Sequence, residues 1–158
     1  MHKLTISILL FSMPILLLAQ EKDTLSLGIQ NGFFNSKRTA SVVGIEIIGY
    51  TGAMVMLNNL WYKDYPRSSF HWFDDNQQWL QMDKMGHAMT SYYIGVVGIR
   101  ALRWSGLSER KSVIYGGILG LSFLTSIEVL DGLSAEWGAS SGDMLANISG
   151  AGLLIAQE

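Results

Sequence analysis

The stretch EVLDGLSAEWGASSGDMLANISG, residues 128–150, decides the fold. Four carboxylates and an asparagine interrupt an apolar background there, and an earlier run, DKMGH at residues 83–87, has the same character. Read as helices, both stretches place polar side chains three or four residues apart, and residues at that spacing share one helix face. The pairs are Asp83 with His87, Glu128 with Asp131, and Asp143 with Asn147.

The residues around these pairs indicate where the helices stop and start. Gly132 directly follows Asp131 and is typical of a helix C-terminus. Ser140 followed by Asp143 matches a capping box, which predicts a last helix over residues 143–156. Because short connections favour antiparallel neighbours, we expect all three pairs to meet at one end of a bundle.

The rest of the chain predicts an all-α fold, an antiparallel bundle of about four helices. Apolar runs at residues 39–60, 82–104 and 109–131 have the length and the glycine spacing of packed helices. Residues 1–19 have the basic start and apolar centre of a secretory signal peptide, and residues 20–38 read as a flexible lead-in. The bundle domain is therefore expected at residues 39–158.

Composition favours a bundle that is embedded in a membrane or associated with one. The 158-residue chain is 49% hydrophobic, with 17 glycines and only 15% charged residues, which is too apolar for an average soluble bundle. Residues 39–60 have about the length that a membrane crossing needs. Residues 61–81 interleave aromatic rings with charges, as segments at the level of the lipid headgroups do.

Location and partners follow from the leader and from the charge. The leader predicts export to the bacterial envelope, and the apolar runs favour the inner membrane over the soluble periplasm. Membrane lipid or another envelope component is then the expected partner. A net charge of −2 without a basic run argues against nucleic acid. The absence of cysteine from the sequence excludes disulfides and a lipid-modified cysteine within it.

The runs DKMGH, EVLD and SSGDMLANISG resemble the YfiM-like family of predicted bacterial envelope proteins, a domain of unassigned function. The same order, an Asp/His helix, then an acid, then a D-x-x-x-N-x-x-G helix, is similar at longer range to VanZ-like membrane proteins. The resemblance covers residues 83–152 and implies a shared helical core. Carried over residue by residue, it points to Asp83, Lys84, His87, Glu128, Asp131, Asp143, Asn147 and Gly150.

The first functional hypothesis is structural or binding. Acid, imidazole and amide groups on facing helices would form a buried, hydrogen-bonded cluster that fixes the register of the helices. In this interpretation Lys84 neutralises one carboxylate and Asn147 joins the structural part of the cluster. A proton or ion pathway is a further alternative, for which so small a bundle would have to form a homo-oligomer.

The main alternative is a metal-dependent hydrolase that acts on an envelope or lipid-linked substrate. One imidazole and three carboxylates form a ligand set suited to zinc, manganese or iron with a bound water. Asp131 or Glu136 would then act as the general base that polarises this water. The four expected metal ligands are Asp83, His87, Glu128 and Asp143.

Overall fold

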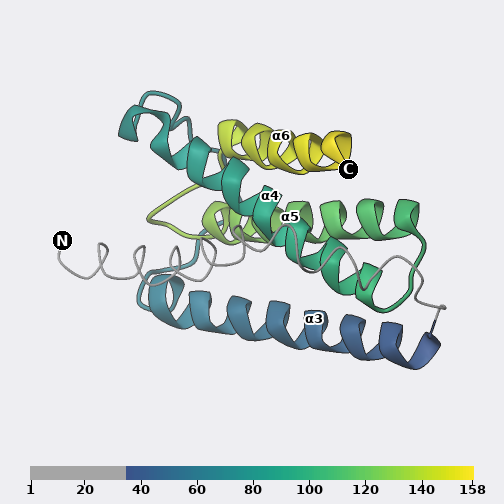
Figure 1. Cartoon of the computed structure of the whole chain (residues 1–158). Coiled ribbons are helices and arrows are strands. Elements are labelled where there is room, and N and C mark those ends of the chain that lie inside the picture. The colour runs from purple at the N-terminus through teal and green to yellow at the C-terminus, as the bar shows by residue number, and fades with distance from the viewer. Residues whose placement is uncertain (1–34) are drawn as a thin grey trace. The chain divides into compact units, whose positions relative to one another are not determined.

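The computed structural model describes residues 35–158, apart from the side chain of Trp79, and it confirms the predicted all-helical fold. Four α-helices pack together: α3 (Ser36–Leu57), α4 (Met82–Trp104), α5 (Glu109–Gly132) and α6 (Ser141–Gln157). Consecutive helices run in opposite directions, and α4 crosses the others diagonally (Figure 1). The expected signal peptide at residues 1–19 and most of the expected lead-in lie outside the described residues.

Helix α3 begins three residues earlier than the sequence predicted. The side chain of Asn35 accepts hydrogen bonds from the backbone N–H groups of Lys37 and Arg38, each at 3.1 Å. This N-cap lets the helix start inside the polar residues that were assigned to the lead-in. At its other end the helical path continues through one π-helical turn, Asn58–Tyr62.

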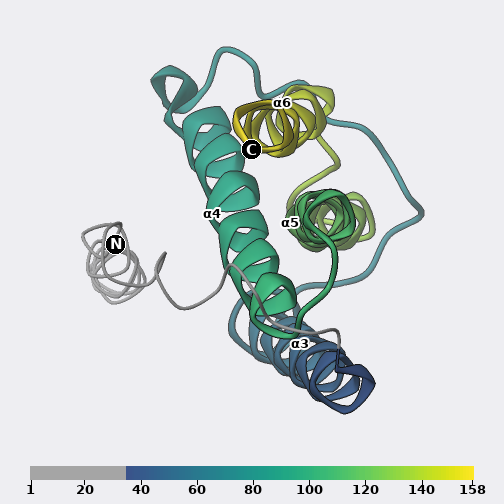
Figure 2. The same cartoon turned by 45° about the vertical axis from the view of Figure 1, so that its right-hand side comes forward.

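Helices α4, α5 and α6 form the tightly packed part of the bundle, and glycines set their separation. A Cβ atom built on Gly120 of α5 would clash with the backbone carbonyl of Ser91 in α4, and one on Gly150 of α6 would clash with the carbonyl of Ala88. Viewed from a second direction, α4 lies against both α5 and α6 (Figure 2). Small residues therefore bring these backbones into direct contact, as the glycine spacing predicted.

Helix α3 is attached to this core less closely. Val42 is the one residue of α3 that is buried against the rest of the described chain. Helix α3 contacts the core at separate points along its length. Thr39 Oγ1 donates to Ser105 Oγ at 3.1 Å, and the ring of Tyr50 packs edge-on against Phe123 at a centroid distance of 5.5 Å. Most of the apolar surface of α3 is consequently left uncovered by the rest of residues 35–158.

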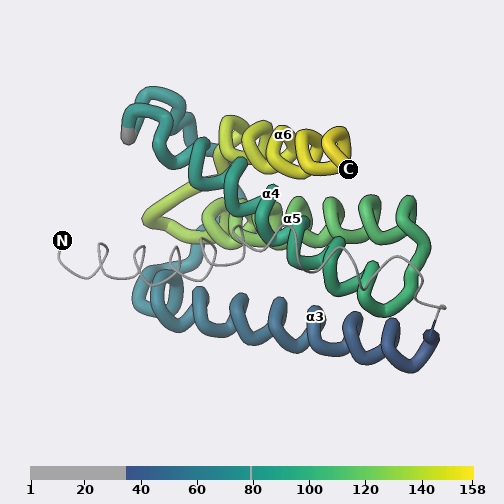
Figure 3. Tube along the Cα trace, viewed as in Figure 1, coloured from purple at the N-terminus to yellow at the C-terminus, as the bar shows by residue number. Residues whose placement is uncertain are grey.

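The aromatic connector, residues 63–81, crosses the end of the bundle between α3 and α4 (Figure 3). It is held to the α5–α6 loop, residues 133–140, by backbone hydrogen bonds, among them Phe73 N–H to the carbonyl of Ala139 at 2.9 Å. His71 Nε2 donates to the carbonyl of Trp137 at 2.7 Å, so His71 serves this junction. The connector is thus a fixed cover over the end where α4 and α6 begin.

Candidate functional site

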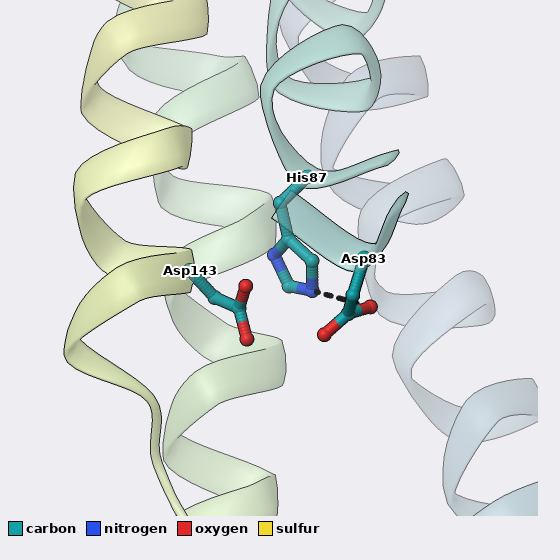
Figure 4. Close-up of side chains that lie close together, drawn as sticks. All are labelled: Asp83, His87 and Asp143. Carbon is teal, nitrogen blue, oxygen red and sulfur yellow. Dashed lines mark ion pairs between the residues drawn. The ribbon is translucent and has the colours of Figure 1, made fainter. Parts of the chain in front are cut away.

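The polar residues that the sequence singled out come together at one end of the bundle. This end contains the first turn of α4, the last turn of α5 and the first turn of α6. Figure 4 shows the imidazole of His87 between the carboxylates of Asp83 and Asp143, which come from α4 and α6. The antiparallel order of the helices brings about this meeting of residues that are up to 60 positions apart.

Lys84 is the cation of the cluster. Its Nζ lies 2.6 Å from Asp75 Oδ1 and 3.1 Å from Asp143 Oδ1, and the Lys84 side chain is only 12% exposed. Asp75, from the aromatic connector, also accepts a hydrogen bond of 2.6 Å from Ser140 Oγ. Lys84 therefore ties the connector, α4 and α6 together through charge-assisted contacts.

Glu128 is buried in the last turn of α5, with only 2% of its surface exposed. Its Oε2 accepts a hydrogen bond of 2.8 Å from the backbone N–H of Ser140, the N-cap residue of α6. Its Oε1 has no hydrogen-bond partner among the described residues and lies 3.6 Å from His87 Nδ1. A buried carboxylate oxygen in this state requires a proton donor or a cation nearby.

His87 connects α4 to both neighbouring helices. Its Nδ1 lies 3.0 Å from Asn147 Oδ1 on α6, and its Nε2 lies 3.9 Å from Asp83 Oδ1 one helical turn earlier. Asn147 is fully buried, and its backbone carbonyl accepts a hydrogen bond of 2.9 Å from Ser91 Oγ. The imidazole is consequently fixed from one side by α6 and left facing acids on the other.

The two residues expected as general bases are placed differently. Asp131 Oδ1 accepts a hydrogen bond of 2.7 Å from the hydroxyl of Tyr62, which is itself buried. Glu136 is exposed on the α5–α6 loop, where its backbone N–H donates to Ser134 Oγ at 3.3 Å. Within the described residues Asp131 thus borders the cluster, whereas the side chain of Glu136 makes no hydrogen bond or ion pair with it.

The local environment shifts the pKa values of Lys84 and of its two partners, Asp75 and Asp143. Burial raises the pKa of Asp143, and repulsion from Asp83 adds to this, although His87 opposes it. Burial by itself would also raise the pKa of Asp75, but hydrogen bonds from Lys84 and Ser140 outweigh it and lower that pKa. For Lys84, burial is outweighed by its bonds to the two aspartates, so its pKa is raised.

Three of the four expected metal ligands form a group that could hold an ion. One donor atom each from Asp83, His87 and Asp143 lies within 4.8 Å of the other two. Glu128 is not part of this group, and its free oxygen lies 3.6 Å from His87 Nδ1. The spacing of the acids in the sequence does not show which of them lies near Nε2 of His87, as Asp83 does, and which lies near Nδ1, as Glu128 does.

Two residues of the site were not expected from the sequence. Asp75 belongs to an Asp-Asp pair in the connector that looks like ordinary solvated charge, and Tyr62 lies among many other aromatic residues. Neither has a motif that marks it, since Asp75 reaches the cluster through the path of the connector and Tyr62 through the π-helical turn that follows α3. The one available signal was Lys84, a lysine next to the Asp/His motif, which can pair with more than one carboxylate.

The fold and the site define a small all-helical protein with a buried acid, imidazole and amide cluster at one end of its bundle. Residues 71–156 match the model of the family described as "Predicted periplasmic lipoprotein (DUF2279)", and the chain belongs to this family, whose function is unknown. The protein is therefore a protein of the bacterial envelope. No curated protein and no solved structure matches the chain.

Proposed function

We propose that this protein is a membrane protein of the envelope in which the polar cluster fixes the helices and the connector in one arrangement and forms a binding site. The observation that carries the proposal is Glu128: one buried carboxylate caps α6 through Ser140 and faces His87 of α4. Polar contacts between buried groups on different helices favour one packing of those helices. The proposal includes a relationship to the YfiM-like and VanZ-like proteins, which the motifs of this chain resemble.

The exposed apolar surface of α3 supports the membrane location. Ile45, Ile48 and Val55 are 69%, 73% and 55% exposed, and only 6% of the most apolar 18 residues of Ser36–Tyr62 is buried within the described part of the chain. That helical path has 27 residues, which corresponds to about 40 Å at 1.5 Å per residue. Helix α5, Glu109–Gly132, is a second segment long and apolar enough to cross a bilayer. Lipid would cover the surface that protein leaves open.

The absence of cysteine agrees with attachment through helices. The family description names lipoproteins, yet the sequence contains no cysteine to which a lipid could be joined.

An open groove of about 460 Å³ between α3 and α5, lined by Met54, Val55 and Val129 among others, would be filled by acyl chains. Apolar side chains facing lipid need no protein partner.

The membrane proposal predicts that the protein resists extraction by alkaline carbonate. The wild-type protein should stay in the membrane pellet, whereas Ile48→Asp should move largely to the soluble or aggregated fraction. A charged residue at mid-bilayer costs about 2.5–3.5 kcal/mol on the insertion scale, which explains the expected shift. Ile48→Leu is the matched control and should behave as wild type. Release of the wild-type protein by carbonate would rule the proposal out.

The structural role of the cluster predicts a loss of stability in Glu128→Ala. The substitution removes the acceptor for Ser140 N–H and the acidic neighbour of His87 Nδ1. We expect the free energy of unfolding to fall by about 1–3 kcal/mol, the cost of unsatisfied buried groups. Thermal unfolding of the detergent-purified protein measures it, with exposed Glu136→Ala as the control. An unchanged or higher melting temperature in Glu128→Ala would contradict the role.

A second function, metal-dependent hydrolysis of an envelope or lipid-linked substrate, is favoured by the grouping of Asp83, His87 and Asp143 donor atoms. The cluster lies at the end covered by the aromatic connector, where a headgroup could reach it from the bilayer surface. Zinc, manganese or iron would supply a bound water of lowered pKa. Asp131, which borders the cluster, is better placed than the exposed Glu136 to accept its proton.

A further inference from the structure

We propose that the cluster binds one divalent transition-metal ion through Asp83, His87 and Asp143, and that Glu128 positions the imidazole instead of binding the ion. The inference rests on the binding role proposed above, and it requires no hydrolysis. It also changes the ligand set expected from the sequence, which counted Glu128 as a fourth ligand.

The three donor atoms already lie in a small space. They are within 4.8 Å of one another, and they come from two helices that pack directly together (Figure 4). Ligand atoms around one zinc ion, each about 2.0–2.2 Å from it, are separated by roughly 3–3.5 Å. Rotation of the side chains alone is therefore enough to close the distances around an ion.

The second observation is the environment of the histidine ring. His87 Nδ1 lies 3.0 Å from Asn147 Oδ1, and Glu128 Oε1 is 3.6 Å away, which is too far for a hydrogen bond. Because Asn147 Oδ1 is an acceptor, Nδ1 donates this hydrogen bond, and the lone pair of the neutral ring is then on Nε2. Nε2 is the nitrogen that faces Asp83, at 3.9 Å. Metal-binding histidines are oriented in this way by a carboxylate or carbonyl on their other nitrogen.

The free oxygen of Glu128 also indicates that the cluster has room for a cation in addition to Lys84. Its Oε1 is buried and has no hydrogen-bond partner in the described part of the chain. Lys84 is already shared between Asp75 and Asp143, at 2.6 and 3.1 Å. Since a carboxylate has two oxygens, Asp143 can keep the ion pair through Oδ1 and bind a metal through the other. The added cation would offset the repulsion among the remaining acids.

The donor set indicates which class of ion fits. One imidazole nitrogen with two carboxylates suits zinc, manganese or iron, whereas calcium and magnesium prefer oxygen ligands alone. The side chain of Asp83 is 46% exposed, so this face of the cluster is open to solvent. Three protein ligands with an open face leave room for water or for an oxygen of a bound molecule.

Metal titration of the full-length protein in detergent tests the proposal. Protein stripped with a chelator is titrated with Co²⁺, whose visible absorption reports the kind and number of ligands, and zinc content is measured after loading with Zn²⁺. We expect one ion per chain. Asp83→Asn and His87→Ala should lose it, and Asp64→Asn, which changes an exposed acid of the connector, should keep it. Asp83 is half-exposed, so Asp83→Asn should remain folded, as circular dichroism will verify.

Glu128→Gln separates positioning from direct binding. If Glu128 acts through His87, the variant should bind Co²⁺ about 10–100-fold more weakly, the usual effect of losing such a partner, with an unchanged absorption spectrum. A changed spectrum would show that Glu128 is a ligand and would overturn its positioning role. If the wild-type protein takes up no more metal than Asp83→Asn does, the metal site itself is overturned. The structural role would survive that result, because it is judged by the melting temperature of Glu128→Ala.

Discussion

Gly120→Ala is expected to destabilise the protein more than any surface substitution, by about 3 kcal/mol in the free energy of unfolding. The new methyl group would lie within 3.0 Å of the backbone of Ser91, and a backbone cannot rotate away as a side chain can. Relief requires α4 and α5 to separate, which would also pull His87 away from Glu128. Thermal unfolding followed by circular dichroism in detergent measures the change.

Gly52→Ala is the matched control for this prediction. Gly52 also lies inside a long helix, but a Cβ built on it meets no atom within 4 Å. Alanine is favoured over glycine in a helix by about 0.8–1.0 kcal/mol, so this variant should be as stable as wild type or slightly more so. If Gly120→Ala and Gly52→Ala have the same melting temperature, close packing of α4 on α5 is not what stabilises the bundle.

The second large effect is expected for Lys84→Met, which should lower the free energy of unfolding by about 3–5 kcal/mol. The substitution leaves the buried carboxylate of Asp143 and the half-buried carboxylate of Asp75 without their shared cation. Lys63→Met, at an exposed position, is the control and should have little effect. Adding Asp143→Asn to Lys84→Met should recover part of the loss, since it removes one of the two uncompensated charges. Equal instability of the single and double variants would contradict this account.

The same ion pair gives stability a pH dependence on the acid side. The pKa of Asp75 is lowered in the folded protein, so its contribution is present above the unfolded value of about 3.9 and is lost as the pH falls through the folded value. Asp75→Asn should therefore be less stable than wild type at pH 7, and the difference should vanish in strong acid. Unfolding measured across this range checks the sign. A difference that grows as the pH falls would exclude the assignment.

Much of the fold could be predicted because local signals agreed with each other. The apolar run of α4 and its boundaries, Met82–Trp104, are as expected, and Ser140 Oγ accepts from Asp143 N–H at 3.2 Å as the capping box predicted. The start of α3 was missed because the cap formed by Asn35 lies within polar residues that resemble a linker. A polar stretch before an apolar run has no feature that separates a cap from a loop.

Most of the residues that meet in the cluster could be predicted from the sequence, but Asp75, Tyr62 and the inner geometry could not. Helix spacing placed Asp83 and His87 on one face, and antiparallel packing brought Asp143 to them. Which side of a ring an acid occupies depends on the rotation of each helix by a few tens of degrees, and no spacing rule defines that. The position of Glu128 behind His87 and the arrival of Asp75 from the connector are both of this kind.

The pairing of the connector with the α5–α6 loop also has a consequence for biosynthesis. Phe73 and Ala139 are joined by a backbone hydrogen bond, yet 66 positions separate them in the chain. At about 5–20 residues per second, the ribosome needs roughly 3–13 s to make the intervening segment. During that interval the aromatic residues of the nascent connector have no loop to dock on.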